Sequence, residues 1–237
     1  MADVDDRPEP DDEEEDEEPG GFLRALRETA IIVVSALVLS ALVRAFLVQA
    51  FFVPSSSMED TLLISDRIIA SKITTSLSGV ERGEIVVFKD PGDWLPEPPP
   101  PEGGLRGAIR MGLTFIGLIP SDSGRDLVKR VIGLEGDRVQ CCDAQGRIIV
   151  NGKALDEPYI IGPTTQVLFD IVVPPNSMFV MGDNRGNSRD SRFHLEQASG
   201  SVPIDNVVGR VVLVVWPFNR LGTEPIPEVF GTIPAPS

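Results

Sequence analysis

The sequence has few of the side chains that most often bind metals. It contains one histidine, His194, and two cysteines, the neighbours Cys141 and Cys142. A zinc site needs three or four ligands at suitable spacing, and none is visible, so we predict no metal site. An ordinary disulfide joins Cα atoms about 4.4–6.8 Å apart. The adjacent cysteines are therefore either two thiols, which we favour, or a strained disulfide.

The usual signatures of serine hydrolases are also missing. His194 follows a polar stretch and is interpreted as a surface loop residue, which leaves no imidazole base. The chain has no Gly-x-Ser-x-Gly elbow, and no lysine stands three residues after a serine. A serine nucleophile in this chain would need a base from a distant part of the sequence.

Positive charge is scarce, and negative charge is concentrated at one end. The net charge is −15, but residues 1–19 hold twelve acidic residues and one arginine, which leaves −4 for the rest. No basic stripe suggests nucleic acid binding. Residues 1–21 are poor in apolar side chains and repel one another, so we predict a disordered acidic tail.

One hydrophobic segment stands out near the N-terminus. Thr29 to Val48 gives twenty residues interrupted only by Arg44, which can extend its guanidinium to an interface. Such a helix is about 30 Å long, enough to cross a bilayer. No small-x-small cleavage site follows it, so residues 22–49 are predicted as an uncleaved anchor rather than a signal peptide. Arginines before the span favour a cytoplasmic N-terminus and an extracytoplasmic main domain.

Beyond the anchor, short β-branched segments bounded by Gly, Pro or Asp predict strands. These segments are 67–71, 84–88, 127–132, 147–150, 177–180 and 207–216. Asn151-Gly152 predicts a tight hairpin turn. The fold class is therefore mainly β, with a single transmembrane helix followed by an antiparallel β domain over residues 50–222.

Two stretches break this pattern. Residues 90–124 contain a polyproline run at 95–101 and an apolar run with Arg106 and Arg110. They form either a surface loop with one short helix or a second contact with an anionic membrane surface. Residues 223–237 are rich in proline and are predicted as an irregular tail.

A lysine is the remaining candidate base. The chain has four: Lys72, Lys89, Lys129 and Lys153. Lys129 stands mid-strand, where it can share a face with Leu127 and Val131. Burial among apolar side chains lowers a lysine pKa, as a general base requires. Lys129 is the best placed of the four; the alternative is a strand lysine paired with a carboxylate such as Asp126.

Five motifs carry a resemblance to a known family. They are FVPSSSM at 52–58, DRI at 66–68, RGEIVVF at 82–88, KRVIGLEGD at 129–137 and GDNRGNSRDSR at 182–192. Together they resemble bacterial type I signal peptidases, membrane-anchored serine proteases that remove signal peptides from exported proteins. The resemblance implies the same β-rich peptidase fold and no cofactor.

Residue roles follow from the matching positions. Ser57 matches the nucleophile and Lys129 the general base. Ser55 matches the serine that forms the oxyanion hole with the Ser57 backbone N–H, and Ser188 matches the residue that orients the lysine. Asp190 and Arg192 match a supporting ion pair. The matching pocket positions are Phe51, Val53, Met58, Leu62, Leu127 and Val128.

The chain departs from the family pattern beside its serines. Asp60 stands where the family usually has proline, and Ser56 replaces a common glycine. We expect an altered loop surface and no lost catalysis. The Pro-rich run has no role assigned by the resemblance.

The predicted function is endoproteolysis at the cell membrane by a monomer, with cleavage of preprotein signal peptides after small residues. One alternative is a cytosolic Ser-Lys autoprotease of the repressor type, which the anchor and the lack of a basic region disfavour. Another is a catalytically inactive, membrane-tethered β domain that acts as a binding module. The joint presence of Ser57, Lys129 and Ser188 disfavours this second alternative.

Overall fold

The computed structural model describes residues 21–73, 78–92, 94–96, 104–115 and 125–236. The predicted disordered tail lies almost wholly outside these ranges. The chain comprises two compact units, Met1–Leu39 and Ser40–Ser237. Most of the anchor helix belongs to the first unit, and the β-rich body belongs to the second.

The helix α1 extends over Gly21–Phe46, so the predicted lead-in and anchor form one element. Within the described ranges it is the one helix long and apolar enough to cross a membrane, with a candidate span at Arg24–Val43. This span lies earlier than the predicted Thr29–Val48, because strand β1 already begins at Val48. Its described side chains are exposed except for the half-buried Ala41 and Val43, as expected for a helix surrounded by lipid.

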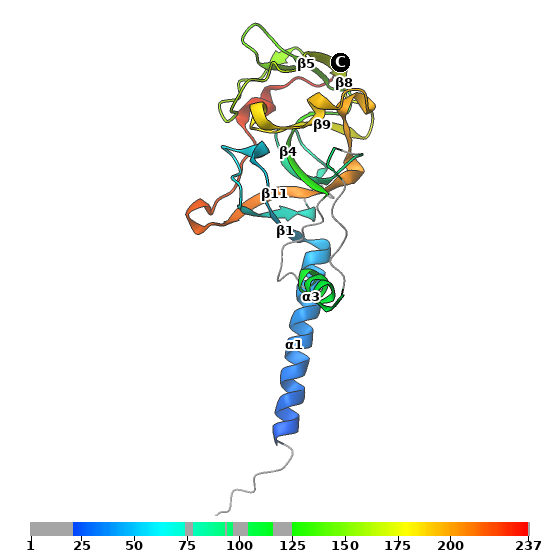
Figure 1. Cartoon of the computed structure of the whole chain (residues 1–237), viewed down its shortest axis with the longest axis vertical. Helices are drawn as coiled ribbons and strands as arrows, with labels where there is room; N and C mark the ends of the chain where they lie inside the picture. The colour runs from blue at the N-terminus through cyan, green and yellow to red at the C-terminus, as the bar shows by residue number, and fades with distance from the viewer. Residues whose placement is uncertain (1–20, 74–77, 93, 97–103, 116–124, 237) are drawn as a thin grey trace, which may run out of the picture. The chain divides into compact units, whose positions relative to one another are not determined.

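The larger sheet contains seven antiparallel strands in the order β1-β2-β11-β3-β4-β9-β10. Their bounds are β1 Val48–Phe52, β2 Arg67–Ser71, β3 Ile85–Lys89, β4 Asp126–Leu134, β9 Ser177–Met181, β10 Val202–Pro203 and β11 Val207–Trp216. Strands far apart in sequence are therefore neighbours, with β11 between β2 and β3 (Figure 1). The predicted mainly β, antiparallel fold class is confirmed.

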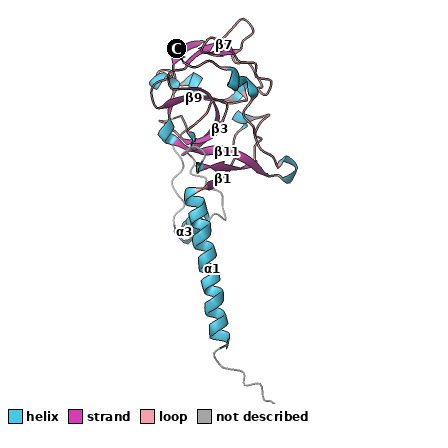
Figure 2. Ribbon diagram, turned by 180° about the vertical axis from the view of Figure 1, so that it is seen from behind, coloured by secondary structure: helices cyan, strands magenta, loops and turns pink. Residues whose placement is uncertain are grey.

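A second sheet has the strand order β7-β6-β5-β8. Its strands are β5 Arg138–Cys141, β6 Ile148–Val150, β7 Lys153–Ala154 and β8 Phe169–Val172. The predicted hairpin turn is confirmed, because Asn151 and Gly152 between β6 and β7 have φ values of 50° and 79°. Figures 1 and 2 both place this sheet at the end of the β body that also holds the C-terminus, away from β1.

The C-terminal segment differs from the predicted irregular tail. It contains a short 3₁₀ helix, Glu228–Thr232, and it buries Phe230 and Ile233 in the core. A Cβ atom built on Gly83 would lie 2.5 Å from the Phe230 ring, so only glycine fits there. The folded body thus extends beyond residue 222, because the apolar side chains of this segment cover part of the core.

The cysteines also differ from the favoured interpretation. Cys141 and Cys142 form a disulfide with each other in the structure, and their Cα atoms lie 3.0 Å apart. The sulfur atoms of the two neighbours reach each other at the end of β5, where Cys141 packs in the core.

The predicted insertion contains a helix, α3, over Gly104–Phe115. This agrees with the short helix expected there, and Leu105 and Ile109 are exposed on it. The suggested contact of this segment with a membrane surface stays a prediction. The ends of the insertion are close together, since Asp90 N–H donates to the Arg125 carbonyl at 2.8 Å.

Candidate active site

The serine cluster lies in a tight turn that directly follows β1. Ser56–Met58 form one turn of 3₁₀ helix, in which Ser57 is 9% exposed and Met58 is 1% exposed. Met58 packs in an apolar cluster with Phe51 and Val53. The Met58 carbonyl accepts the backbone N–H groups of the two residues that close the turn. Burial of Met58 therefore fixes the backbone that presents Ser57.

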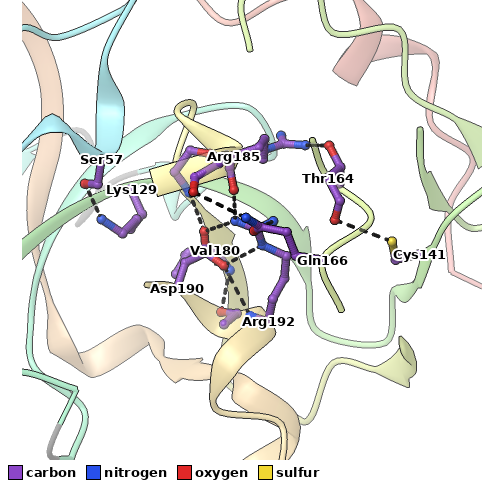
Figure 3. A network of polar contacts seen from close by, with 12 residues as sticks. Ser57, Lys129, Cys141, Thr164, Gln166, Val180, Arg185, Asp190 and Arg192 are labelled. Carbon is purple, nitrogen blue, oxygen red and sulfur yellow. Dashed lines mark hydrogen bonds and ion pairs between the residues drawn. The ribbon is translucent and has the colours of Figure 1, made fainter. Parts of the chain in front are cut away.

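Lys129 reaches Ser57 from the middle of β4. Its Nζ atom lies 2.6 Å from Ser57 Oγ and 3.1 Å from the Val128 carbonyl oxygen, although Ser57 and Lys129 are 72 positions apart in sequence (Figure 3). The lysine side chain is buried, and its neighbours in β4 pair with β3. The fold thus brings together the serine and the lysine that the sequence singled out.

The surroundings of Lys129 make its neutral form more accessible than that of an exposed lysine. Burial lowers the pKa of Lys129 to about 8, although the carboxylates of Asp190 and Asp183 act in the opposite direction. A deprotonated amine 2.6 Å from a hydroxyl can accept its proton. Such an arrangement is what proton transfer from a serine to a lysine requires.

The two other predicted serines both lie near Ser57. Ser55 Oγ lies 3.3 Å from Ser57 Oγ. A Cβ atom built on Gly182 would lie 2.2 Å from Ser188 Oγ and 2.4 Å from the Ser57 carbonyl oxygen, so Ser188 and Ser57 meet at this glycine. The absence of a side chain at residue 182 is what permits this close approach.

The predicted hydrogen bond between Ser188 and Lys129 is not formed. Ser188 Oγ is buried, and it lies close enough to the Asp190 carboxylate to contribute to the lowered pKa of that group. The Nζ atom of Lys129 is directed to Ser57 and to the Val128 carbonyl. The orienting role of Ser188 therefore stays a prediction.

Asp190 and Arg192 form the expected ion pair behind the lysine. Arg192 Nε lies 2.8 Å from Asp190 Oδ1, and both side chains are fully buried (Figure 3). Asp190 also accepts the Gly182 N–H at 3.0 Å. Burial alone would raise the pKa of Asp190, but hydrogen bonds and charge from Arg192 outweigh it and hold this pKa below its ordinary value.

Two further buried ion pairs were not predicted. Arg130 binds both oxygens of Asp183 at 2.9 and 2.7 Å, and Asp183 also accepts the Thr61 hydroxyl at 2.6 Å. Arg185 pairs with Glu157 at 2.7 Å. Three of these four paired residues belong to the matched motifs. The sequence shows that they are charged, but it does not show which of them form ion pairs.

A small apolar pocket of about 200 Å³ adjoins the serine and the lysine. Five of the six predicted pocket residues line it: Phe51, Val53, Met58, Leu127 and Val128. Leu62 does not; it is fully buried in the apolar cluster beneath, because the turn after Met58 directs it inward. Residues that the sequence did not suggest also line the pocket: Phe52, Pro54, Val87, Leu95 and Asp126.

His194 differs from the predicted surface position. Its side chain is 9% exposed, and its ring stacks on Trp94 with a centroid distance of 4.3 Å. Trp94 belongs to the start of the insertion, 100 positions before His194, so the sequence around His194 does not indicate that a tryptophan covers its ring. The imidazole packs where the insertion leaves the β body.

Comparison with known proteins decides the family. The model of the family described as "Signal peptidase, peptidase S26" matches residues 26–216 of this chain. The chain belongs to this signal peptidase family. It is therefore a serine endopeptidase, and the single N-terminal apolar helix fits a membrane-anchored member of the family.

Individual relatives extend this likeness over most of the chain. The probable signal peptidase I of Mycobacterium leprae is 35% identical over 229 residues, which cover 84% of this chain and 78% of the relative. The probable signal peptidase I-2 of Synechocystis is 40% identical over 169 residues, which cover 71% and 63%. A crystal structure of a signal peptidase I from Enterococcus faecalis V583 has 24% identity and a TM-score of 0.36, and covers 55% of this chain and 95% of that chain.

The two departures of this signal peptidase from the family pattern, Ser56 and Asp60, lie on either side of the nucleophile turn, together with Glu59. Ser56 Oγ accepts a hydrogen bond from Asn187 Nδ2 at 2.7 Å, and Glu59 accepts one from Asn184 Nδ2 at 3.2 Å. Asp60 has a φ of 76°, which proline cannot adopt. Both hydrogen bonds join the serine turn to the loop that contains Asn184 and Asn187. The expected change of the loop surface relative to the family stays a prediction.

Proposed function

We propose that the protein removes N-terminal signal peptides from exported preproteins by means of a Ser57–Lys129 dyad. The observation that carries this proposal is the 2.6 Å distance between Lys129 Nζ and Ser57 Oγ in a buried setting that lowers the lysine pKa to about 8. The relatives named signal peptidase I support the substrate class. A binding module does not require a buried lysine beside a serine, so the presence of this pair weighs against an inactive binding module.

The geometry allows a complete acyl-transfer cycle. Neutral Lys129 takes the Ser57 proton as Oγ attacks the scissile carbonyl. The Ser57 backbone N–H and the Ser55 hydroxyl hold the oxyanion, a contribution of roughly 10²–10³ in rate per donor in such sites. Protonated Lys129 then gives its proton to the leaving amine. Lys129 next activates a water molecule, which hydrolyses the acyl-enzyme and frees Ser57.

The pocket supports cleavage after small residues. Its volume of about 200 Å³ and its apolar walls suit short side chains close to the reacting atoms. A preprotein segment would lie extended beside the active-site strands, with its backbone paired to them. The edge strand β1 offers backbone groups for that pairing.

The anchor gives this activity a location. We propose that the span Arg24–Val43 of α1 crosses the cell membrane once, with the acidic tail in the cytoplasm and the peptidase domain, from β1 onward, outside. The apolar part of a signal peptide would then lie in the same bilayer as α1. The protein acts as a monomer in this proposal, since each chain carries both members of the dyad.

The proposed function is tested with the full chain in detergent. A preprotein with an Ala-x-Ala segment is expected to be cut after the second alanine, which mass spectrometry of the mature product would show. The same preprotein with leucine at both small positions is the control and is expected to remain intact. Failure to cut the first substrate, or cleavage at unrelated positions in both, would contradict the proposal.

Activity is expected to fall on the acid side of about pH 8, where burial places the pKa of Lys129. Only the neutral amine takes the serine proton, so kcat/KM should fall about tenfold per pH unit below that pKa. Above it, the base is fully neutral and the rate should level off. A peptide without titratable groups near the cut, assayed from pH 5 to 10, gives the profile. A rate that stays flat well into the acid range would exclude Lys129 as the base.

A further inference from the structure

Leu95 lines the pocket beside Ser57 and Lys129, although it belongs to the insertion and not to the matched motifs. It is half-buried, and it faces the same pocket as Val53 and Val128. No role for the insertion follows from the family motifs. The pocket wall of this chain therefore contains a side chain that the catalytic strands do not supply.

A carboxylate fixes the backbone that presents Leu95. Asp90 Oδ1 accepts the N–H groups of Gly92 at 3.1 Å and Trp94 at 3.0 Å, and Asp90 Oδ2 accepts the Leu95 N–H at 3.2 Å. Three donors on one carboxylate close a turn directly after β3. The position of Leu95 is thus built into the fold at the start of the insertion.

The neighbouring tryptophan anchors the same turn in the core. Trp94 is 5% exposed, and it packs edge-on against Phe88 of β3 at a centroid distance of 6.1 Å. On its other side it stacks on His194. Trp94 is held on both sides and Asp90 binds three N–H groups, so the backbone that carries Leu95 is fixed beside the pocket.

We propose that Leu95 is a specificity-determining residue that limits the size of the small side chains which a substrate places in the pocket. A rigid leucine at the wall of a pocket of about 200 Å³ removes room that a larger substrate side chain would need. One methylene of misfit in an apolar pocket changes kcat/KM by about 10–200-fold. The inference rests on the proposed function, because it concerns the choice of substrate at the same site.

The test uses two changes with opposite effects in the full chain in detergent. Peptides carry glycine, alanine, valine or leucine at each of the two small positions in turn. Leu95→Ala is expected to raise kcat/KM for valine relative to alanine at one or both positions by roughly tenfold or more. Leu95→Phe is expected to lower kcat/KM for alanine relative to glycine. Leu168→Ala, at an exposed leucine outside the pocket, should keep the preferences of the natural chain.

A measurement of peptide binding without cleavage tests the role of Leu95 independently of the proposed function. The same peptides are titrated against Ser57→Ala with and without Leu95→Ala, so that the Kd ratio of valine to alanine peptides is measured without turnover. If the natural chain cuts no peptide, the proposed function fails, while a shifted Kd ratio still supports Leu95. Unchanged ratios in both assays, or an equal change for every peptide, would overturn the role of Leu95.

Discussion

Ser57→Ala and Lys129→Met are each expected to lower kcat by roughly 10⁴–10⁶-fold, as loss of a nucleophile or its base does in other serine proteases. Methionine keeps the length of the lysine side chain but cannot accept a proton. Because the two residues act as one unit, the double variant should be no slower than the slower single variant. The measurement is single-turnover cleavage of a preprotein by the full chain in detergent.

Lys153→Met is the matched control for this experiment. Lys153 lies at the start of β7 in the second sheet, and its side chain is exposed. This variant should cleave at the rate of the natural chain. Near-normal cleavage by Ser57→Ala or Lys129→Met would show that another nucleophile or base carries the reaction.

Arg192→Met is expected to lower the free energy of unfolding by about 3–5 kcal/mol, because it leaves a buried carboxylate without its partner. Asp190 and Arg192 are both fully buried, and Arg192 Nη2 also donates to the Arg185 carbonyl at 3.0 Å. The arginine holds the pKa of Asp190 below its ordinary value, so this carboxylate stabilises the fold above its unfolded pKa and loses that effect in acid.

Removal of Arg192 should weaken that pH dependence. The Gly182 N–H still bonds to Asp190, but the lowering effect of the arginine on the pKa of Asp190 is lost, so the variant should lose less stability than the natural chain between pH 7 and pH 4. Denaturant unfolding of the full chain at pH 4 and pH 7 measures both effects. Arg138→Met is the control, since its ion pair with Asp170 is 59% and 46% exposed and should contribute about 0–1 kcal/mol. Equal losses for the two variants would contradict the argument.

Much of the fold could be predicted because its strands are short, β-branched and clearly bounded. The segments 67–71 and 207–216 match β2 and β11, and Asn151-Gly152 matches the hairpin turn. Strand β1 was missed for a physical reason. Val48–Phe52 follows the anchor directly and is apolar except for Gln49, and no glycine or proline separates it from the helix.

The sequence predicted the site residue that is unusual by itself, a lysine in an apolar strand. It did not predict which charged residues pair with each other. A lysine amid apolar strand residues singled out Lys129, and its pKa is indeed lowered by burial. The pairing of Arg130 with Asp183 depends on the register of β4 against β9 and on the following loop. Leu62 shows the same limit, because whether it faces the pocket or the core depends on the turn before it.

The two ends of the insertion are paired with each other, so the length of the insertion has little effect on the rest of the fold. Lys89 pairs with Asp126 across β3 and β4, and Asp90 N–H bonds to the Arg125 carbonyl just beyond. Doubling or halving a loop closed in this way changes its closure entropy by only about 0.6 kcal/mol. Related chains can therefore gain or lose most of this segment while the strands that carry Lys129 keep their register. Its evolutionary variation is expected to begin after Leu95, where the turn bound by Asp90 ends.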